Sequence, residues 1–433
     1  MKKLVFALMI GAIGAGLACG QSPTPPPLTL QQAEQIALKN HPQIFAAHYN
    51  ALAADQGVRE ARSAYFPTVD GEITGSAADR DSRLGAGFLA ASRLFNREGQ
   101  GIAVGQLITD SGRTANLVAS SRAQAYAANE DADSTRYDVL LAVNQAYFEA
   151  LRSQALLKVA QQTVAERQVV LEQVTAMVKN QLKSKLDLSF AKVNLAQASL
   201  LEIQARNNIK IAFAQLTRAM GLQNTPSFML EEAPVPPAPP STAASVLAEA
   251  AQNRPELASL RFSLESAQKF QRAERDLSFP TVAAAGVAGY IPAIEQLTST
   301  RVPDHYEAAA VNVEIPVFNG RLFAARREAA LMRERQANEN LRDMQERIAR
   351  DVRVAWADAV TAYQRIGVAN DLLNQAQLAM ALAQGRYNLG LSSIVELSQA
   401  QLNETQAAIQ DVNARYDFEN DTAILQYQAG TLR

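Results

Sequence analysis

Apolar residues recur every seven positions in two segments of the chain, residues 137–221 and 346–430. Such a spacing, sustained over several turns, predicts a helix that packs lengthwise against another helix. Each segment holds two such helices joined by a short turn, so each is predicted to be a helical hairpin. The second hairpin repeats the first at an offset of 209 residues, as shown by Leu157, Val164, Leu171 and Val178, then Ile366, Leu373, Met380 and Tyr387.

The second helix of each hairpin carries a row of alanines that also stand seven residues apart. Side chains this small allow a neighbouring backbone to come close. The row consists of Ala191, Ala198, Ala205, Ala212 and Ala219 in the first hairpin, and of Ala400, Ala407 and Ala414 in the second.

The internal repeat also extends upstream of the hairpins. Asn40-His41-Pro42 recurs as Asn253-Arg254-Pro255, and Phe66-Pro67 recurs as Phe279-Pro280. The stretch between the two copies is rich in proline and cannot be helical, so it is predicted to be a linker. Each copy is predicted to contain a first helix, two strands and a helical hairpin. The predicted boundaries are 30–222 for repeat 1, 223–242 for the linker, 243–433 for repeat 2, 112–221 and 320–430 for the hairpins, and 30–64 for the first helix of repeat 1.

Four segments ahead of the hairpins are predicted to be strands. In the clearest of them Val69 and Ile73 alternate with Asp70 and Glu72, so one face is apolar and the other polar. Their length, about nine to eleven residues, suits strands that cross a bilayer at a tilt. The predicted strands are 67–76, 99–109, 280–290 and 308–318.

Four strands are too few to close a barrel, because about eight is the usual minimum. An open sheet edge in lipid would leave backbone groups without hydrogen bonds. If the strands span a membrane, several chains must therefore share one barrel. The alternative is a small soluble sheet that caps a helical bundle.

The long helix after the strands of repeat 1 is predicted to span residues 112–178. At 1.5 Å per residue its length is roughly 100 Å, so it must be supported laterally by other helices. Polar residues, including Glu166, Arg167 and Gln168, interrupt its apolar seam. A polar face suits a wall with water behind it, and the alternative is the solvated face of a simple coiled coil.

The N-terminal residues 1–18 are predicted to be a signal peptide, with an apolar core too short to span a bilayer. The only cysteine, Cys19, follows directly. Gly16-Leu17-Ala18-Cys19 resembles the lipobox of bacterial lipoproteins, which predicts acylation of Cys19. The glycine departs from that pattern, so ordinary signal-peptidase cleavage nearby is the alternative. Residues 19–29 are predicted to be a proline-rich tether.

Charge and residue chemistry narrow the possible functions. The chain has 433 residues and a formal net charge of −2, which does not favour binding to nucleic acid. Its three histidines, His41, His48 and His305, have no carboxylate or cysteine at ligand spacing, so no metal site is predicted. Residues 85–90 match a dinucleotide-binding fingerprint in their letters alone, with no βαβ pattern around them, and there is no P-loop or nucleophile elbow, so we predict that the protein is not an enzyme.

Taken in order, these features resemble the TolC-like outer membrane efflux proteins over residues 28–433. The resemblance rests on the tandem layout and on motifs that occur in both repeats. These are the Asn-x-Pro openings at Asn40 and Asn253, the Phe-Pro steps before strands and the Gly-Arg starts at Gly112 and Gly320; the hairpin turn at 387–393 of the second repeat adds to the resemblance.

The resemblance implies a mainly helical fold with a small β part. Three identical chains would each give four strands to a 12-stranded transmembrane β-barrel and their long antiparallel helices to an α-barrel in the periplasm. It implies a passive outer-membrane exit duct for drugs, small toxic compounds or polypeptides. A periplasmic adaptor and an inner-membrane transporter would supply it, as in tripartite efflux or type I secretion. The alternative is a non-conducting, lipid-anchored coiled-coil spacer or interaction protein of the cell envelope.

The resemblance also places the periplasmic mouth at the two hairpin turns, 178–185 and 387–393. In the second turn Leu389-Gly390-Leu391 is similar to the aliphatic-Gly-aliphatic element that contacts adaptors. In the first turn Gln181 occupies the place of the glycine. The expected adaptor contacts are Leu182, Lys183, Leu389, Gly390, Leu391 and Ser392.

Acidic residues follow each turn, where the family has its constriction. Asp187 and Glu396 would form a ring of carboxylates in a trimer, which would favour cations. Each also lies three residues after a serine, a spacing that predicts a capping box. Gln399 occupies a deeper position of the constriction. Tyr387 is a candidate for bonds between helices at the mouth, and plain packing is the alternative.

Overall fold

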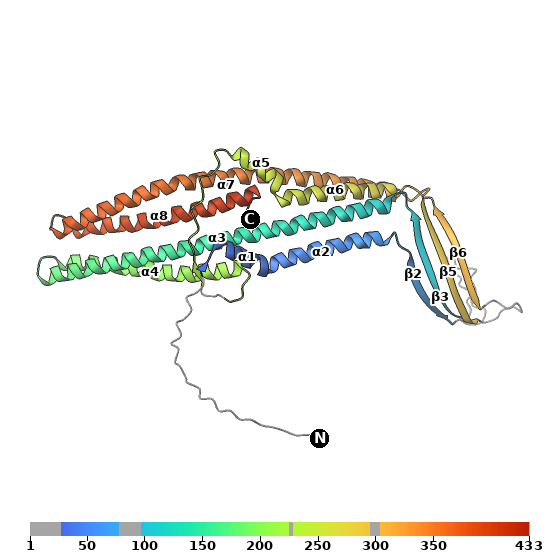
Figure 1. Ribbon diagram of the computed structural model, residues 1–433, viewed down its shortest axis with the longest axis horizontal. Helices are drawn as coiled ribbons and strands as arrows, with labels where there is room; N and C mark the ends of the chain where they lie inside the picture. The colour runs from blue at the N-terminus through green and yellow to red at the C-terminus, as the bar shows by residue number, and fades with distance from the viewer. Residues whose placement is uncertain (1–26, 78–96, 225–227, 295–303, 433) are drawn as a thin grey trace, which may run out of the picture.

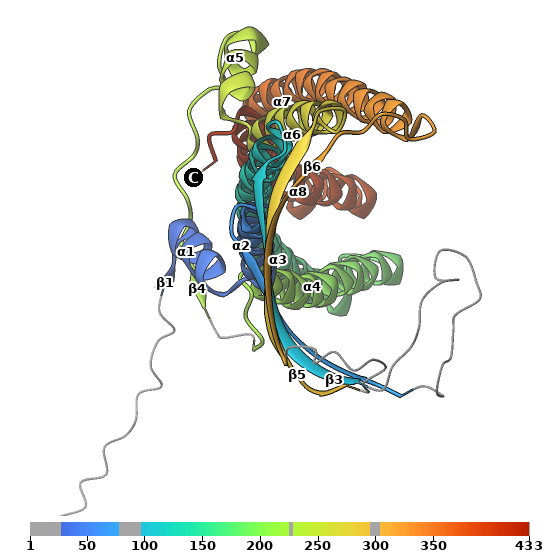
Figure 2. The ribbon, with the colours of Figure 1, turned by 90° about the vertical axis from the view of Figure 1, so that its right-hand side faces the viewer.

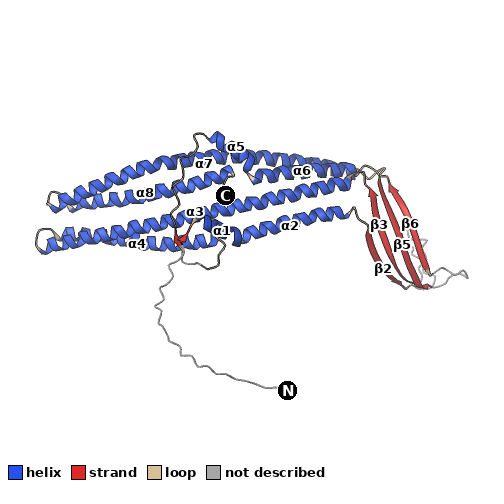
Figure 3. Cartoon of the chain, in the orientation of Figure 1, coloured by secondary structure: helices blue, strands red, loops and turns tan. Residues whose placement is uncertain are grey.

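The computed structural model describes residues 27–77, 97–224, 228–294 and 304–432. The predicted signal peptide, Cys19 and most of the predicted tether lie outside these described residues. The chain forms a long helical column with a four-stranded sheet at one end (Figures 1 and 3). In the part of the chain that is described, no helix is both long and apolar enough to cross a membrane.

The secondary structure elements occur in the same order in the two halves of the chain. The first half contains β1 (Pro27–Leu28), α1 (Leu30–Asn40), α2 (Pro42–Ser63), β2 (Thr68–Ser76), β3 (Arg97–Thr109), α3 (Arg113–Lys179) and α4 (Lys185–Ala219). The second half contains β4 (Met229–Leu230), α5 (Ala243–Asn253), α6 (Pro255–Asp276), β5 (Thr281–Ile294), β6 (His305–Glu314), α7 (Leu322–Asn388) and α8 (Ile394–Ala429).

The helices form a single curved layer, four helices wide. The helices α3 and α7 are each 67 residues long and run along the whole column. Along one side of α3, α2 and α4 lie end to end, whereas α6 and α8 lie end to end between α3 and α7 (Figure 1). The layer therefore has two free edges, one made by α2 and α4 and the other by α7.

Small side chains hold this layer together. The predicted alanine row of α4 is buried except for its last member, Ala219, which is half-buried. The helix α7 carries a second buried row that the sequence analysis missed. The larger residues of the predicted seam, such as Leu157 and Leu373, are only half-buried, with the exception of Tyr387, which is buried. Alanine at the contact lets long helices approach closely. Its burial also costs no side-chain conformational entropy, whereas the burial of larger residues does. The buried residues are Ala191, Ala198, Ala205 and Ala212 on α4, and Ala355, Ala362, Ala369, Ala376 and Ala383 on α7.

The prediction of one continuous first helix over 30–64 is wrong, because the chain breaks it at His41. Pro42 has no N–H and disfavours a helical conformation in the preceding residue. His41 is accordingly extended, with φ −72° and ψ 120°, and caps α2 by accepting a hydrogen bond from the Gln43 N–H. The same break occurs at Arg254, ahead of Pro255.

The four long strands form one antiparallel sheet in the order β2-β3-β5-β6. Both β3 and β5 extend further toward the tip of the sheet than predicted. The strand predicted at 308–318 occupies residues 305–314 instead. It ends ahead of Pro316, which cannot donate a ladder hydrogen bond. The outer edges of β2 and β6 have no strand partner among the described residues.

The two faces of the sheet differ in chemistry, as alternation in the first strand predicts. One face is mainly apolar, with Gln100 and Glu307 near the tip of the sheet, and most of its side chains are exposed in the single chain. The other is polar along the edge strands and lined mostly by glycine and alanine in the middle, with Val287 among them. By the strand register, the first face carries Val69, Ile73, Ile102, Val104, Val311 and Val313, and the second carries Asp70, Glu72, Gly101, Ala103, Ala285, Gly289, Asn312 and Glu314.

The linker between the repeats contains secondary structure, because part of it forms β4, which pairs in parallel with β1. The two strands are joined to the column by Tyr147 of α3. Its buried hydroxyl donates to the Leu28 carbonyl at 2.8 Å and the Glu231 carbonyl at 2.6 Å. Viewed along the column, β1, β4, α1 and α5 lie on one side of the helical layer (Figure 2).

Tyr147→Phe is expected to lower the free energy of unfolding by about 0.5–1.5 kcal/mol, because the hydroxyl proton shared by the Leu28 and Glu231 carbonyls is lost and, among the described residues, only the Leu28 carbonyl keeps another donor, the Glu231 N–H. Burial raises the pKa of Tyr147 to about 12, so the hydroxyl remains a donor at neutral pH. The measurement is the melting temperature of the purified protein in detergent. Tyr126→Phe is the control, since this ring is 50% exposed. Equal melting temperatures for the two variants would contradict the anchoring role.

Candidate functional site at the hairpin tips

The turns of both hairpins lie together at the end of the column opposite the sheet (Figure 1). They have the same backbone geometry. Leu182 N–H donates to the Met177 carbonyl and Leu391 N–H donates to the Arg386 carbonyl, each at 2.8 Å. This six-residue closure is the Schellman motif, which needs one residue in the left-handed region.

Gly390 takes the left-handed position in the second turn, with φ 75°, and Gln181 takes it in the first, with φ 61°. The glycine is therefore explained by the turn itself. Nothing lies within 4 Å of the position that a Cβ of Gly390 would occupy. Gln181 keeps the same turn at the cost of a strained backbone, so the departure seen in the sequence does not change the shape of the tip.

The leucines of the turns point outward. Leu182, Leu389 and Leu391 are 72%, 76% and 66% exposed. Lys183 instead turns inward, and its Nζ lies 4.1 Å from the centroid of the Tyr387 ring. Ser392 is half-buried. Of the six expected adaptor contacts, the three leucines and Gly390 thus form the exposed tip.

The first of the two predicted capping boxes is present. The Ser184 N–H donates to Asp187 Oδ2 at 2.9 Å, and the Asp187 N–H donates to Ser184 Oγ at 3.2 Å. These bonds hold the Asp187 carboxylate at the start of α4, where the helix dipole also favours negative charge.

The second predicted capping box, at Ser393 and Glu396, is only half formed. The Glu396 N–H donates to Ser393 Oγ at 3.3 Å. In the described chain the Glu396 carboxylate is paired instead with Arg386 of α7, with Nε and Oε1 3.1 Å apart. The guanidinium competes with the backbone amide because a charged donor binds a carboxylate more strongly. The sequence analysis did not single out Arg386, which has no counterpart of like charge in the first hairpin.

Tyr387 is a packing residue in this structure. Its side chain is 1% exposed and packs with Val174, Ala191 and Leu397, which come from three other helices. Its hydroxyl has no hydrogen-bond partner among the described residues. Burial raises the pKa of Tyr387 to about 12, and the negative charge of Asp187 adds to the shift.

Gln399 lies on the exposed face of α8, one turn deeper than Glu396. Its Nε2 donates to Asn403 Oδ1 at 2.8 Å within the same helix. The constriction residues predicted on α8 therefore follow one side of that helix.

Arg167, predicted to face water, is buried between α3 and α8, and its side chain is only 5% exposed. Its Nη2 donates to the Gln401 carbonyl at 2.7 Å and to Thr405 Oγ1 at 2.9 Å. Asn194 of α4 adds a bond to Ser398 Oγ at 2.8 Å. These bonds form a polar layer that joins the two hairpins above their tips. Sequence periodicity could not reveal it, because the arginine follows the spacing of a polar face.

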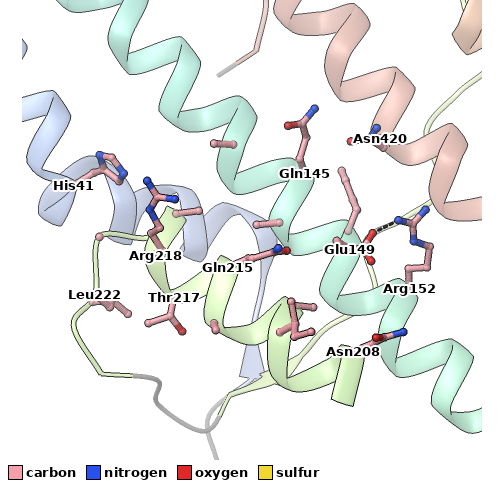
Figure 4. A pocket seen from close by; sticks show the side chains of 18 of the residues that line it. His41, Gln145, Glu149, Arg152, Asn208, Gln215, Thr217, Arg218, Leu222 and Asn420 are labelled. Carbon is pink, nitrogen blue, oxygen red and sulfur yellow. Dashed lines mark hydrogen bonds and ion pairs between the residues drawn. The ribbon is translucent and has the colours of Figure 1, made fainter. Parts of the chain in front are cut away.

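A recess of about 1380 Å³ lies near the middle of the column, away from the tips (Figure 4). It is bounded by α3, α4 and α8 and by the break between α1 and α2. Its lining is mixed in charge, with an ion pair between Glu149 and Arg152 on α3 and Arg218 contributed by α4. It contains none of the predicted mouth residues.

The model of the family "Outer membrane efflux protein" matches residues 34–222 and 246–431. The chain belongs to this family. The two matched ranges fall on the two halves of the chain, each with its own hairpin. Family membership confirms the predicted TolC-like resemblance and fold class. It places the protein in the outer membrane, with the helical column extending into the periplasm. Proteins of this family are efflux channels and not enzymes, in agreement with the prediction.

Known relatives match nearly the whole length of this outer membrane efflux protein. The outer membrane efflux protein BepC of Brucella suis is 22% identical over 96% of this chain and 87% of the relative. Protein CyaE of Bordetella pertussis is 26% identical over 88% of this chain and 80% of the relative. The crystal structure of CusC has the same fold, with a TM-score of 0.80 and 18% identity over 93% of this chain and 92% of CusC.

Tyr387→Phe is expected to leave the melting temperature unchanged or to raise it, because the variant removes a buried hydroxyl that has no hydrogen-bond partner in the described part of the chain. The measurement is the same melting experiment as for Tyr147→Phe, which serves as the contrasting variant. A loss as large as that of Tyr147→Phe would show that the Tyr387 hydroxyl is bonded in the assembled protein.

Proposed function

We propose that the protein is the passive exit duct of a tripartite efflux or type I secretion system. Three copies would form a continuous water-filled path from the hairpin tips to the cell exterior. Drugs, other small toxic compounds or polypeptides would pass through it. The observation that carries the proposal is that both the sheet and the helical layer end in edges without a partner element among the described residues of one chain.

The sheet supports closure by further copies. Its apolar face suits lipid, and a sheet edge surrounded by lipid must have its backbone groups paired. Because β2 and β6 are both edges, the β6 strand of one copy can pair with β2 of the next. Three copies would supply twelve strands, each copy contributing the same two edges.

The helical layer supports the same closure. On α4, Leu186, Val193 and Leu200 are 64%, 52% and 63% exposed and stand seven residues apart. They lie on the opposite side of the helix from the buried alanine row, which packs on α3. An apolar row at this spacing is the pattern of a helix that packs on another helix. In the trimer its partner would be α7 of the neighbouring copy.

The tips suit docking of another protein. Exposed leucines from both hairpins form an apolar surface at the end of the column, whereas a soluble end would be expected to be polar. We propose that a periplasmic adaptor binds there and couples the duct to an inner-membrane transporter. The cargo is chosen by that transporter, so the duct itself needs only a suitable width and charge.

The mouth would carry a ring of carboxylates. Asp187 and Glu396 are close to the tips, and three copies would bring six such groups together, which favours cations over anions. Arg386 pairs with Glu396 and offsets part of this charge. Asp187 is therefore the stronger contributor in the proposed ring.

Acylation of Cys19 would add a lipid anchor in the outer membrane. This residue lies outside the described part of the chain, and the proposal rests on the sequence pattern alone. Incorporation of a radioactive fatty acid into the wild-type protein, and its absence from Cys19→Ser, is the expected result.

The decisive experiment is planar-bilayer recording of the purified, detergent-solubilised protein. The proposal predicts discrete and uniform conductance steps from a species that migrates as a trimer. Persistent electrical silence together with a monomeric protein would instead support the non-conducting, lipid-anchored spacer or interaction protein.

Charge variants at the mouth give a graded prediction. Asp187→Asn is expected to weaken cation preference more than Glu396→Gln does, because Arg386 already neutralises Glu396. Arg386→Gln is the opposing control and is expected to strengthen cation preference by freeing the carboxylate. The measurement is the reversal potential in a salt gradient. If the reversal potentials of all three variants equal that of the wild-type protein, a carboxylate ring at the constriction is contradicted.

A further inference from the structure

Tyr306 of β6 lies across two glycines of the neighbouring strands. In the register of the sheet, Tyr306 is opposite Gly289 of β5, and Gly289 is opposite Gly101 of β3. Glu72 of β2 completes this row across the sheet. The ring of one residue therefore spans the distance between β6 and β3.

The glycines form a notch that the tyrosine fills. A Cβ added to Gly289 would lie 2.4 Å from both Cζ and the hydroxyl oxygen of Tyr306. A Cβ added to Gly101 would lie 2.4 Å from the same oxygen. These distances are far inside van der Waals contact, so the ring can lie flat on the sheet only because both positions lack a side chain.

The notch is on the polar face of the sheet. Tyr306 shares this face with Asp70, Glu72, Asn312 and Glu314, which would be costly to expose to lipid. In the proposed function this face surrounds the water-filled path, and the inference rests on that function. Tyr306 is 41% exposed, so one side of its ring covers the glycines and the other is open to that path.

The row of Tyr306 is close to the outer end of the barrel. The chain enters β2 from α2 and leaves β6 toward α7, so the helix-proximal end of the sheet holds Thr68 and Glu314. Tyr306 lies at the opposite end, one residue from the start of β6. A solute entering from outside would pass this row before it reached the alanines of the inner rows.

We propose that Tyr306 sets the size limit for solutes in the outer part of the duct. The Gly101–Gly289 notch keeps its ring flat on the inner wall, and the position of this ring determines the width of the bore at this row. Three copies would place three such rings at one height. With the notch open, the bore is wide at this level. If the notch is filled, each ring must turn away from the wall and into the path of the solute.

The test measures the width of the barrel at this row independently of the periplasmic mouth. Ala310, on the same face and two rows further in, is replaced by cysteine. Intact cells are then treated from outside with maleimides carrying polyethylene glycol chains of increasing size. The ratio of the labelling rate of a large reagent to that of a small one reports the width. The chain without the introduced cysteine gives the background from Cys19.

Gly289→Ala is expected to lower this ratio, because the added Cβ displaces the ring. Gly286→Ala is the matched control in the same strand. Gly286 lies on the other face, and a Cβ there meets only the Ala308 carbonyl oxygen at 3.8 Å, so the ratio should stay at the wild-type value. The double variant Gly289→Ala with Tyr306→Ala is expected to recover the ratio. Tyr306→Ala alone, which leaves both glycines in place, should raise it.

A ratio for Gly289→Ala equal to that of Gly286→Ala, with both variants assembled to the same extent on native gels, would overturn the proposal. The same holds if the double variant stays as restrictive as Gly289→Ala. Failure of the proposed function looks different, because Ala310→Cys would then be unreactive toward even the smallest reagent in every variant.

Discussion

Backbone hydrogen bonding at the sheet edges is the constraint on which the rest of the structure depends. Lipid offers no partner for an N–H or a carbonyl group, so a membrane-spanning sheet must close on itself. The long sheet of this chain has four strands, and β2 and β6 each have one edge without a strand partner among the described residues. The order β2-β3-β5-β6 puts one strand of each repeat at an outer edge, which makes the two edges of identical copies complementary under rotation.

The helical layer obeys the same geometry as the sheet from which it extends. Its two edges also belong to different repeats, with α2 and α4 of the first repeat on one side and α7 of the second on the other. Alanine rows allow the helices within a chain to pack closely, while Arg167 and Asn194 join the two hairpins through hydrogen bonds. Close packing along the layer and hydrogen bonds between its two hairpins would suit the wall of the proposed water-filled duct.

Much of this architecture follows from the sequence. A seven-residue spacing repeated at a fixed offset predicted two hairpins, and α3 differs from the predicted helix by one residue at each end. The break at His41 was missed, although Pro42 carried the signal for it. The position of β6 was misjudged because the alternation of apolar residues over 311–317 continues past Pro316, ahead of which the strand ends.

At the hairpin tips, local chemistry was more predictable than contacts between distant segments. The Ser184 and Asp187 cap depends on a three-residue spacing and was predicted correctly. The pair formed by Arg386 and Glu396 joins different helices, as do the buried bonds of Arg167. Tyr306 on its two glycines is likewise a product of strand register, which a single strand's sequence does not specify. Such contacts become visible only once the elements are placed beside one another.

The most direct measurement of the central claim is the mass of the purified protein in detergent by native mass spectrometry. The account predicts a single species that contains three chains, since only neighbouring copies can satisfy the β2 and β6 edges. A stable, folded single chain under the same conditions would contradict it.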